Sequence, residues 1–224
     1  MIVAASLQTW PSAAILPGLY HDWSASVLPH NEQNVENLAL GANVPRIISV
    51  DSISDILPPY RRTPIEWLLR YHNLREPPAT PGGRAELLVG MCMDNRKDLV
   101  IPKEFAFVIR AAGGNLRDHA FDISFAIAIG GVRAIALLAH TNCGMVGVKQ
   151  RRAAFIEGLV ARGGWDQGRA ANHFDESVAV YEIEDAVTFV LEETSRLASV
   201  YPAVLVAPLL YRVEDDRLLQ VAPG

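Results

Sequence analysis

Cysteine is scarce in this chain, with two among 224 residues. Small secreted domains that depend on disulfides are dense in cysteine, so a disulfide scaffold is excluded. Positive charge is also scarce, because the net charge is −5 and the sequence pI is about 5.7. Nucleic acids and anionic membranes select for clusters of lysine and arginine. The sequence therefore predicts neither a nucleic-acid-binding protein nor a membrane-surface protein.

No long apolar run is unbroken. The longest, around residues 120–139, is interrupted by Asp122, Ser124 and Arg133, so it predicts no membrane span. The N-terminal stretch lacks the Lys/Arg region of a signal peptide and contains Pro11 and Pro17, so we expect no signal peptide. Hydrophobic residues make up 50% of the chain and charged residues 20%, enough for a substantial core. We expect a soluble cytoplasmic protein.

The chain divides into two regions that differ in composition and in hydrophobic pattern. Residues 1–84 are rich in proline, with the pairs Pro58-Pro59 and Pro77-Pro78, and predict an N-terminal arm that carries short helices and lies outside the sheet. A capping box with proline at the first helical position, Thr63-Pro64-Ile65-Glu66, begins one of these helices. Another short helix is expected around residues 31–40. The remaining chain, residues 85–224, is expected to be an α/β domain.

Short apolar runs alternate with helical patterns from residue 85 onward. Buried parallel strands are predicted at residues 85–91, 105–110 and 134–139, and a last strand at residues 203–213. Helices are predicted from Asp118 to Gly130-Gly131 and over residues 178–200, with a loop at residues 163–172. This order indicates an open, mainly parallel sheet flanked by helices.

Each cysteine lies in a polar cluster that follows an apolar run. Cys92 begins the sequence CMDNR after one run, and His140 begins HTNCG, which contains Cys143, after another. Two thiolates and one imidazole are a three-ligand set that leaves tetrahedral zinc one open position. Because the carboxyl ends of parallel strands meet at one edge of a sheet, we expect the two clusters to lie close together.

Other interpretations of the cysteines remain open at this stage. They could form a disulfide in an oxidising compartment, or be inert thiols in the core. A redox pair is a third reading, although the local spacing is His-x-x-Cys and not Cys-x-x-Cys.

The two clusters together resemble the zinc signature of the β-class carbonic anhydrases. The stretch VIRAAGG, residues 108–114, is similar to that family's arginine-and-glycine segment, and residues 181–221 resemble its closing helix and strand. The motif sequences CMDNR and HTNCGM most resemble those of the branch of this family that includes carbonyl sulfide and carbon disulfide hydrolases. Ala111 departs from the pattern, because the family often has asparagine there.

The resemblance implies Cys92, His140 and Cys143 as zinc ligands, with Asp94 and Arg96 as a catalytic dyad beside the metal. The implied reaction is the reversible hydration of carbon dioxide to bicarbonate by a zinc-bound hydroxide. It also implies a homodimer or a larger homo-oligomer, because N-terminal helices of family members commonly wrap a partner subunit.

Two alternative functions stay open. One is hydrolysis of carbonyl sulfide or carbon disulfide at the same site, and the other is a non-catalytic, zinc-stabilised homologue. In some family members the aspartate occupies the fourth metal position until it moves onto the arginine, so the sequence leaves the state of Asp94 open. His119 and His173 are candidates for proton relay.

Overall fold

A six-stranded sheet with the order β1-β6-β5-β4-β2-β3 is the centre of the fold. The computed structural model describes residues 44–76 and 85–224. Four strands are parallel: β2 (Leu87–Cys92), β3 (Ala106–Ala111), β4 (Ala134–His140) and β5 (Leu205–Arg212). β6 (Arg217–Ala222) returns antiparallel to β5, and β1 (Arg46–Ile48) pairs antiparallel with β6. The predicted α/β class is confirmed.

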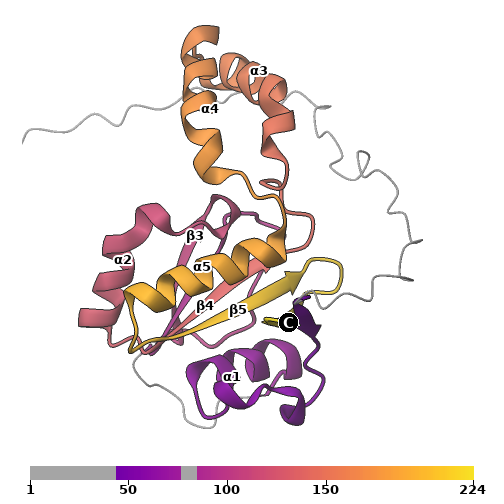
Figure 1. Cartoon of the computed structure of the whole chain (residues 1–224), viewed down its shortest axis with the longest axis vertical. Coiled ribbons are helices and arrows are strands. Elements are labelled where there is room, and N and C mark those ends of the chain that lie inside the picture. The colour runs from indigo at the N-terminus through magenta and orange to yellow at the C-terminus, as the bar shows by residue number, and fades with distance from the viewer. Residues whose placement is uncertain (1–43, 77–84) are drawn as a thin grey trace, which may run out of the picture. The chain divides into compact units, whose positions relative to one another are not determined.

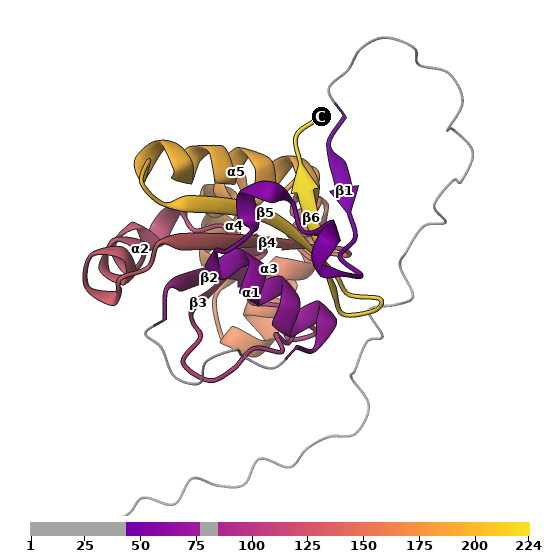
Figure 2. The same ribbon diagram turned by 90° about the horizontal axis from the view of Figure 1, so that it is seen from below.

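Helices cover both faces of this sheet (Figures 1 and 2). On one face lies α1 (Pro64–Leu69), which continues as a turn at Arg70–Leu74. On the other lie α5 (Ala186–Val200) and α2 (Ala120–Phe125), the latter inside a helical segment from Arg117 to Gly130. Beyond the carboxyl end of β4, α3 (Arg152–Gly163) and α4 (Gln167–Tyr181) pack on each other, with the Phe155 and Phe174 ring centroids 5.0 Å apart. Short helical turns lie at Ile53–Asp55, Pro58–Tyr60, Ala112–Gly114 and Val148–Arg151.

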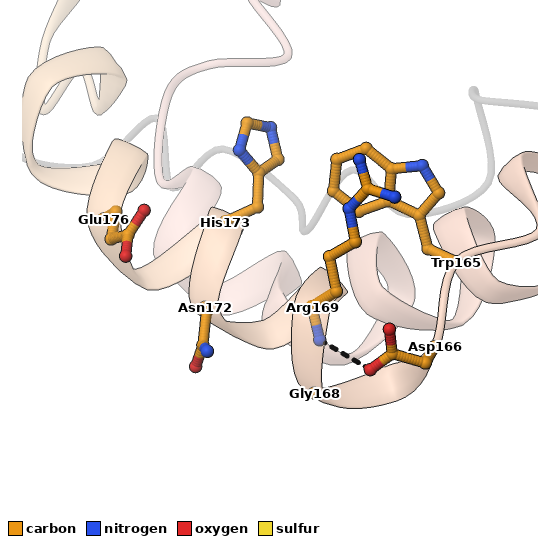
Figure 3. Close-up of a pocket in the computed structure, with 7 residues that line it drawn as sticks. All are labelled: Trp165, Asp166, Gly168, Arg169, Asn172, His173 and Glu176. Atoms are coloured by element: carbon orange, nitrogen blue, oxygen red, sulfur yellow. Dashed lines mark hydrogen bonds between the residues drawn. The ribbon is translucent and has the colours of Figure 1, made fainter.

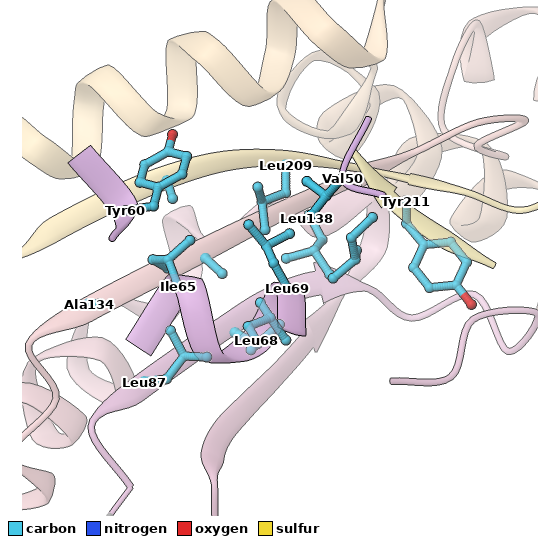
Figure 4. Packing of buried hydrophobic residues seen from close by; sticks show 14 of the residues in the cluster. Val50, Tyr60, Ile65, Leu68, Leu69, Leu87, Ala134, Leu138, Leu209 and Tyr211 are labelled. Carbon is cyan, nitrogen blue, oxygen red and sulfur yellow. The ribbon is translucent and has the colours of Figure 1, made fainter. Parts of the chain in front are cut away.

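The core on the α1 side shows why this helix belongs to the domain. Ile65, Leu68 and Leu69 are fully buried against sheet residues such as Leu87 and Leu209 (Figure 4). Burial of each such side chain contributes about 1.5–3 kcal/mol. Pro64 is the first residue of the helix, as predicted, and Thr63 Oγ1 accepts a hydrogen bond from Ile65 N at 3.2 Å. The predicted capping box is not formed, because the Glu66 carboxylate accepts from Arg62 N instead of Thr63 N.

The prediction that residues 1–84 lie outside the sheet is wrong for residues 46–48. β1 forms an edge strand of the sheet, with Ile47 opposite Val221, and residues 44–76 belong to the same compact unit as residues 85–224. A three-residue strand among prolines has too little periodicity to be seen in the sequence. The helix expected around residues 31–40 lies outside the described residues.

Two further predictions are corrected around α4. Residues 167–172, expected to belong to a loop, begin this helix, since Asp166 caps it by accepting a hydrogen bond from Arg169 N at 2.9 Å. The single helix expected over residues 178–200 is two helices, interrupted where Ile183 pairs with Val146 in an isolated bridge. Asp185 then caps α5 by accepting from Thr188 N at 2.8 Å.

The other boundaries differ in smaller ways. The helical segment ends at Gly130-Gly131 as predicted, but Asp118 does not cap it and instead accepts a hydrogen bond from the Tyr181 hydroxyl at 2.8 Å. β3 is an edge strand with exposed side chains, whereas a buried strand was expected. Within the described ranges, no helix is long and apolar enough to cross a bilayer.

Candidate metal centre

Two neighbouring strands deliver the candidate ligands to one point. β2 ends at Cys92 and β4 ends at His140, and the register that places Met91 opposite Leu138 aligns these ends. Cys143 follows in the turn after β4. The two Sγ atoms and a ring nitrogen of His140 lie within 4.8 Å of one another, and all three residues are buried. The expected meeting of the two cysteine clusters is therefore present in the structure.

His140 has its ring held in the tautomer that a metal requires. Nδ1 lies 2.8 Å from the carbonyl oxygen of Thr141, and because a carbonyl can only accept, Nδ1 carries the proton. Nε2 then keeps a lone pair, yet it is buried and has no hydrogen-bond partner among the described residues. A buried polar atom without a partner costs about 1–3 kcal/mol. An unpaired nitrogen beside two sulfurs is the donor set that zinc takes, so the residues present fit such an ion.

The two cysteines are free thiols. The neighbouring Cys143 thiol holds the pKa of Cys92 well below its ordinary value, and the closeness of Cys92, together with burial, raises the pKa of Cys143. The raised pKa of Cys143 means that this thiol keeps its proton at neutral pH. Because thiolates and not thiols ligate metals, a cation at this point would release that proton.

Asp94 and Arg96 form a bidentate pair in the loop after β2. Arg96 Nη2 lies 2.6 Å from Asp94 Oδ2, and the Arg96 backbone N–H donates to Oδ1 at 2.9 Å. The guanidinium holds the pKa of the Asp94 carboxyl well below its usual range. Arg96 Nη2 also donates to the carbonyl of Asn142 at 2.8 Å, which ties this loop to the one between His140 and Cys143. Asp94 is thus paired with Arg96 in this structure.

Two further cations, Lys97 and Arg110, hold the Asp94 loop, and neither was predicted as a site residue from the sequence. Lys97 Nζ donates to the backbone carbonyl of Asp94 at 3.2 Å, and Arg110 Nη1 donates to the same oxygen at 3.3 Å. Arg110 Nη2 also donates to the carbonyl of Lys97 at 3.0 Å. Arg110 lies within the VIRAAGG stretch, which resembles a segment of the carbonic anhydrase family. This resemblance is a sequence signal that could have pointed to Arg110 as a residue near the site.

Glu214 clamps the loop between His140 and Cys143. Its two carboxylate oxygens accept hydrogen bonds from Thr141 Oγ1 and Asn142 Nδ2, each at 2.7 Å. Asn142 adopts a left-handed backbone with φ of 54°, which asparagine tolerates better than most residues. Glu214 lies in the turn between β5 and β6, so this turn fixes the loop between His140 and Cys143. No local sequence pattern predicts this contact.

Apolar side chains cover the sulfur side of the centre. Ile183 is buried against Cys92 and Cys143, and Met145 and Phe189 pack on the same cluster. Ile183 reaches this position because it lies between α4 and α5, where its backbone N–H donates to the Met145 carbonyl at 3.1 Å. The sequence pattern predicted a continuous helix over residues 178–200, which gave Ile183 no place beside the cysteines.

The two histidines considered for proton relay have partners of their own. His119 Nδ1 lies 2.9 Å from Asp122 Oδ2 near the start of α2. His173 lines a shallow hollow on α4 with Trp165 and Arg169, whose guanidinium carbon lies 3.9 Å from the Trp165 ring centroid (Figure 3). None of the three candidate ligands lines this hollow. Neither histidine forms a hydrogen bond with Cys92, His140 or Cys143.

No protein-family model and no curated protein matches the sequence. Among solved structures, the carbonic anhydrase from Glaciozyma antarctica is similar at 21% identity and a TM-score of 0.50, over 73% of this chain and 95% of that chain. The carbonic anhydrase from Streptococcus mutans is similar at 20% identity and a TM-score of 0.50, over 75% of this chain and 100% of that chain. A β-carbonic anhydrase, isoform I of Trichomonas vaginalis, matches at 19% identity and a TM-score of 0.50, over 67% of this chain and 88% of that chain. The chain therefore has the fold of the β-class carbonic anhydrases, the family that its two cysteine motifs resemble.

Proposed function

We propose that this protein catalyses the reversible hydration of carbon dioxide to bicarbonate, with zinc held by Cys92, His140 and Cys143. The observation that carries the proposal is the buried, unpartnered Nε2 of His140 beside two free thiols. Zinc in such a set lowers the pKa of a water ligand from about 15.7 to about 7, which supplies a nucleophile at neutral pH.

The Asp94–Arg96 pair orients the attacking water. Asp94 is an acceptor, since its low pKa keeps the carboxylate ionised at neutral pH. Arg96 occupies both carboxylate oxygens from one side, which fixes the direction in which the remaining lone pairs point. Such a carboxylate accepts a hydrogen bond from water and so aims one of the water's lone pairs at the substrate carbon.

The apolar side of the centre suits carbon dioxide. Ile183 and Phe189 have no hydrogen-bonding group on their side chains, Met145 has only a weak acceptor in its sulfur, and Ile183 is 3% exposed. Carbon dioxide is small and uncharged, so contact with such side chains costs it little solvation, whereas bulk water is excluded from them. The product is an anion and is less well accommodated by that wall.

Stopped-flow hydration of carbon dioxide tests the proposal, with zinc content measured on the same full-length protein. We expect zinc-dependent hydration above the buffer rate. Cys143→Ser, which removes one sulfur donor, is expected to lose both metal and activity. Hydrogen sulfide release from carbonyl sulfide or carbon disulfide, without hydration of carbon dioxide, would contradict carbon dioxide as the substrate. A zinc-loaded protein that is inactive on all three compounds would contradict the proposal that this protein is an enzyme.

A further inference from the structure

Lys97 is a lysine buried beside the metal centre. The residue is 2% exposed and is one of the largest fully buried residues of the described chain. Lysine is almost never fully buried unless its charge is paired. Its ammonium group nevertheless forms no ion pair with a carboxylate of the described residues, and its hydrogen bond is the one to the Asp94 carbonyl at 3.2 Å.

The negative groups that face Lys97 belong to the centre itself. Burial lowers the pKa of Lys97 below its ordinary value, and the negative charges of Cys92, Asp94 and Cys143 oppose this shift, while the nearby Arg110 adds to it. The hydrogen bond to the Asp94 carbonyl places the ammonium in the loop that connects β2 to the Asp94–Arg96 pair. The charge on Lys97 is therefore directed at the metal centre and not at a structural partner elsewhere.

Three cations surround this loop. Arg96 binds the Asp94 carboxylate, and Lys97 and Arg110 bind the Asp94 backbone carbonyl. Their formal charge balances the three anions that the centre presents with a metal bound, which are Asp94 and two thiolates. When the Glu214 carboxylate on the loop between His140 and Cys143 is also counted, a divalent cation leaves the centre with a formal single positive charge. An excess of that sign favours a small anion at the open metal position.

We propose that Lys97 is a positioning residue that makes the metal centre selective for a small monovalent anion, bicarbonate being the one that the reaction uses. The inference rests on the proposed function and names a residue that controls how its charged product is held. Lys97 acts through space on the open metal position and also holds the backbone of Asp94. Two unit charges about 10 Å apart interact strongly enough at an effective dielectric constant of about 20 to change an affinity roughly tenfold.

Anion binding to the cobalt-substituted, full-length protein tests this role without turnover. Azide serves as the anionic probe and imidazole as the neutral probe at about pH 8, where imidazole is uncharged, and both are titrated by the visible absorption of cobalt. Lys97→Met removes the charge and the hydrogen bond. Lys97→Gln removes the charge and keeps a donor for the Asp94 carbonyl, Lys97→Arg restores the charge, and Lys103→Met is the control at an exposed lysine.

We expect both neutral variants to bind azide about tenfold more weakly than wild type while imidazole binding is unchanged. Lys97→Arg is expected to recover azide binding, and Lys103→Met to match wild type. Equal azide affinity in wild type and Lys97→Gln would overturn the charge role, as would an equal loss for azide and imidazole. A wild type that takes up no cobalt would overturn the metal centre as well. A wild type that binds cobalt and azide but does not hydrate carbon dioxide would overturn the proposed function alone.

Discussion

The guanidinium of Arg96 lies along the carboxylate of Asp94, with Nε 3.1 Å from Oδ1 and Nη2 2.6 Å from Oδ2. The same Nη2 reaches the carbonyl of Asn142 in the loop that carries Cys143. One arginine therefore holds the Asp94 carboxylate and also contacts the loop between His140 and Cys143.

Arg96→Ala is expected to lower carbon dioxide hydration about 10–100-fold while zinc content stays close to wild type, because residues that orient the immediate surroundings of a metal contribute on that scale. Asp94→Asn keeps the shape, removes the charge and is expected to lose rate similarly. Arg133→Ala is the matched control, since Arg133 pairs with Glu86 at the opposite end of β4. Stopped-flow rates equal to wild type in both dyad variants would rule out the dyad.

Gly113 is required both by its backbone and by its closeness to the centre. Its φ is 67°, and a Cβ at this position would lie 2.6 Å from Cδ1 of Ile183, the residue that covers the two sulfurs. Gly164 has a similar φ of 66° with nothing within 4 Å of an added Cβ. Alanine at position 164 therefore measures the cost of backbone strain alone, without the steric clash expected at position 113.

We expect Gly164→Ala to lower the free energy of unfolding by about 1 kcal/mol through backbone strain. Gly113→Ala is expected to lose about 1–3 kcal/mol more, because the added methyl group overpacks against Ile183, and to lower activity as well. Urea unfolding and stopped-flow assays on both variants measure these effects. Equal losses of stability, with full activity in Gly113→Ala, would contradict the close packing.

The meeting of the candidate ligands could be predicted from the sequence, because residues that follow neighbouring parallel strands lie at the same edge of the sheet. Cys92 and His140 follow two apolar runs, so the topology alone brings them together. The burial of Lys97 was not predictable, since CMDNRK is a polar segment and lysine is ordinarily exposed. Ile183 was missed because the apolar pattern of residues 178–200 continues across the break between two helices. The Glu214 clamp depends on the turn after β5, far from the cysteines in sequence.

His72 makes stability depend on pH. It is 1% exposed, its Nδ1 accepts from Val100 N at 3.1 Å, and its Nε2 donates to the carbonyl of Asp216 at 2.8 Å. The bond from Val100 requires the neutral ring, because a protonated Nδ1 cannot accept, and burial lowers the pKa of His72 below its ordinary 6.5. Its contribution is therefore complete above pH 6.5. It is lost as the pH falls from there through the lowered folded-state value, because the unfolded chain takes up the proton first.

We expect the free energy of unfolding of wild type to fall below pH 6.5 more steeply than that of His72→Gln, by up to about 1.4 kcal/mol per pH unit. Urea denaturation of both proteins across this pH range compares the slopes. The other histidines contribute to both curves alike, so the difference isolates His72. Parallel curves would show that His72 does not titrate on unfolding.

The N-terminal residues provide a test of assembly. Residues 1–43 contain Trp10, Tyr20 and Trp23, and the proposal is that they pack across a second subunit in a homodimer or larger homo-oligomer, where burial contributes about 25 cal/mol per Å². A deletion must stop before residue 44, because β1 and the following turns belong to the sheet domain. The truncated protein is expected to show a smaller mass or lower solubility by light scattering. An unchanged mass and solubility would remove the assembly role.

The central claim is that Cys92, His140 and Cys143 bind one catalytic zinc, and elemental analysis tests it most directly. Full-length protein purified under reducing conditions is expected to contain about one zinc per chain. Cys143→Ser is expected to contain little zinc and to melt at a lower temperature, because metal binding is coupled to folding. A fully folded wild type that contains no zinc and takes up none on addition would contradict the account.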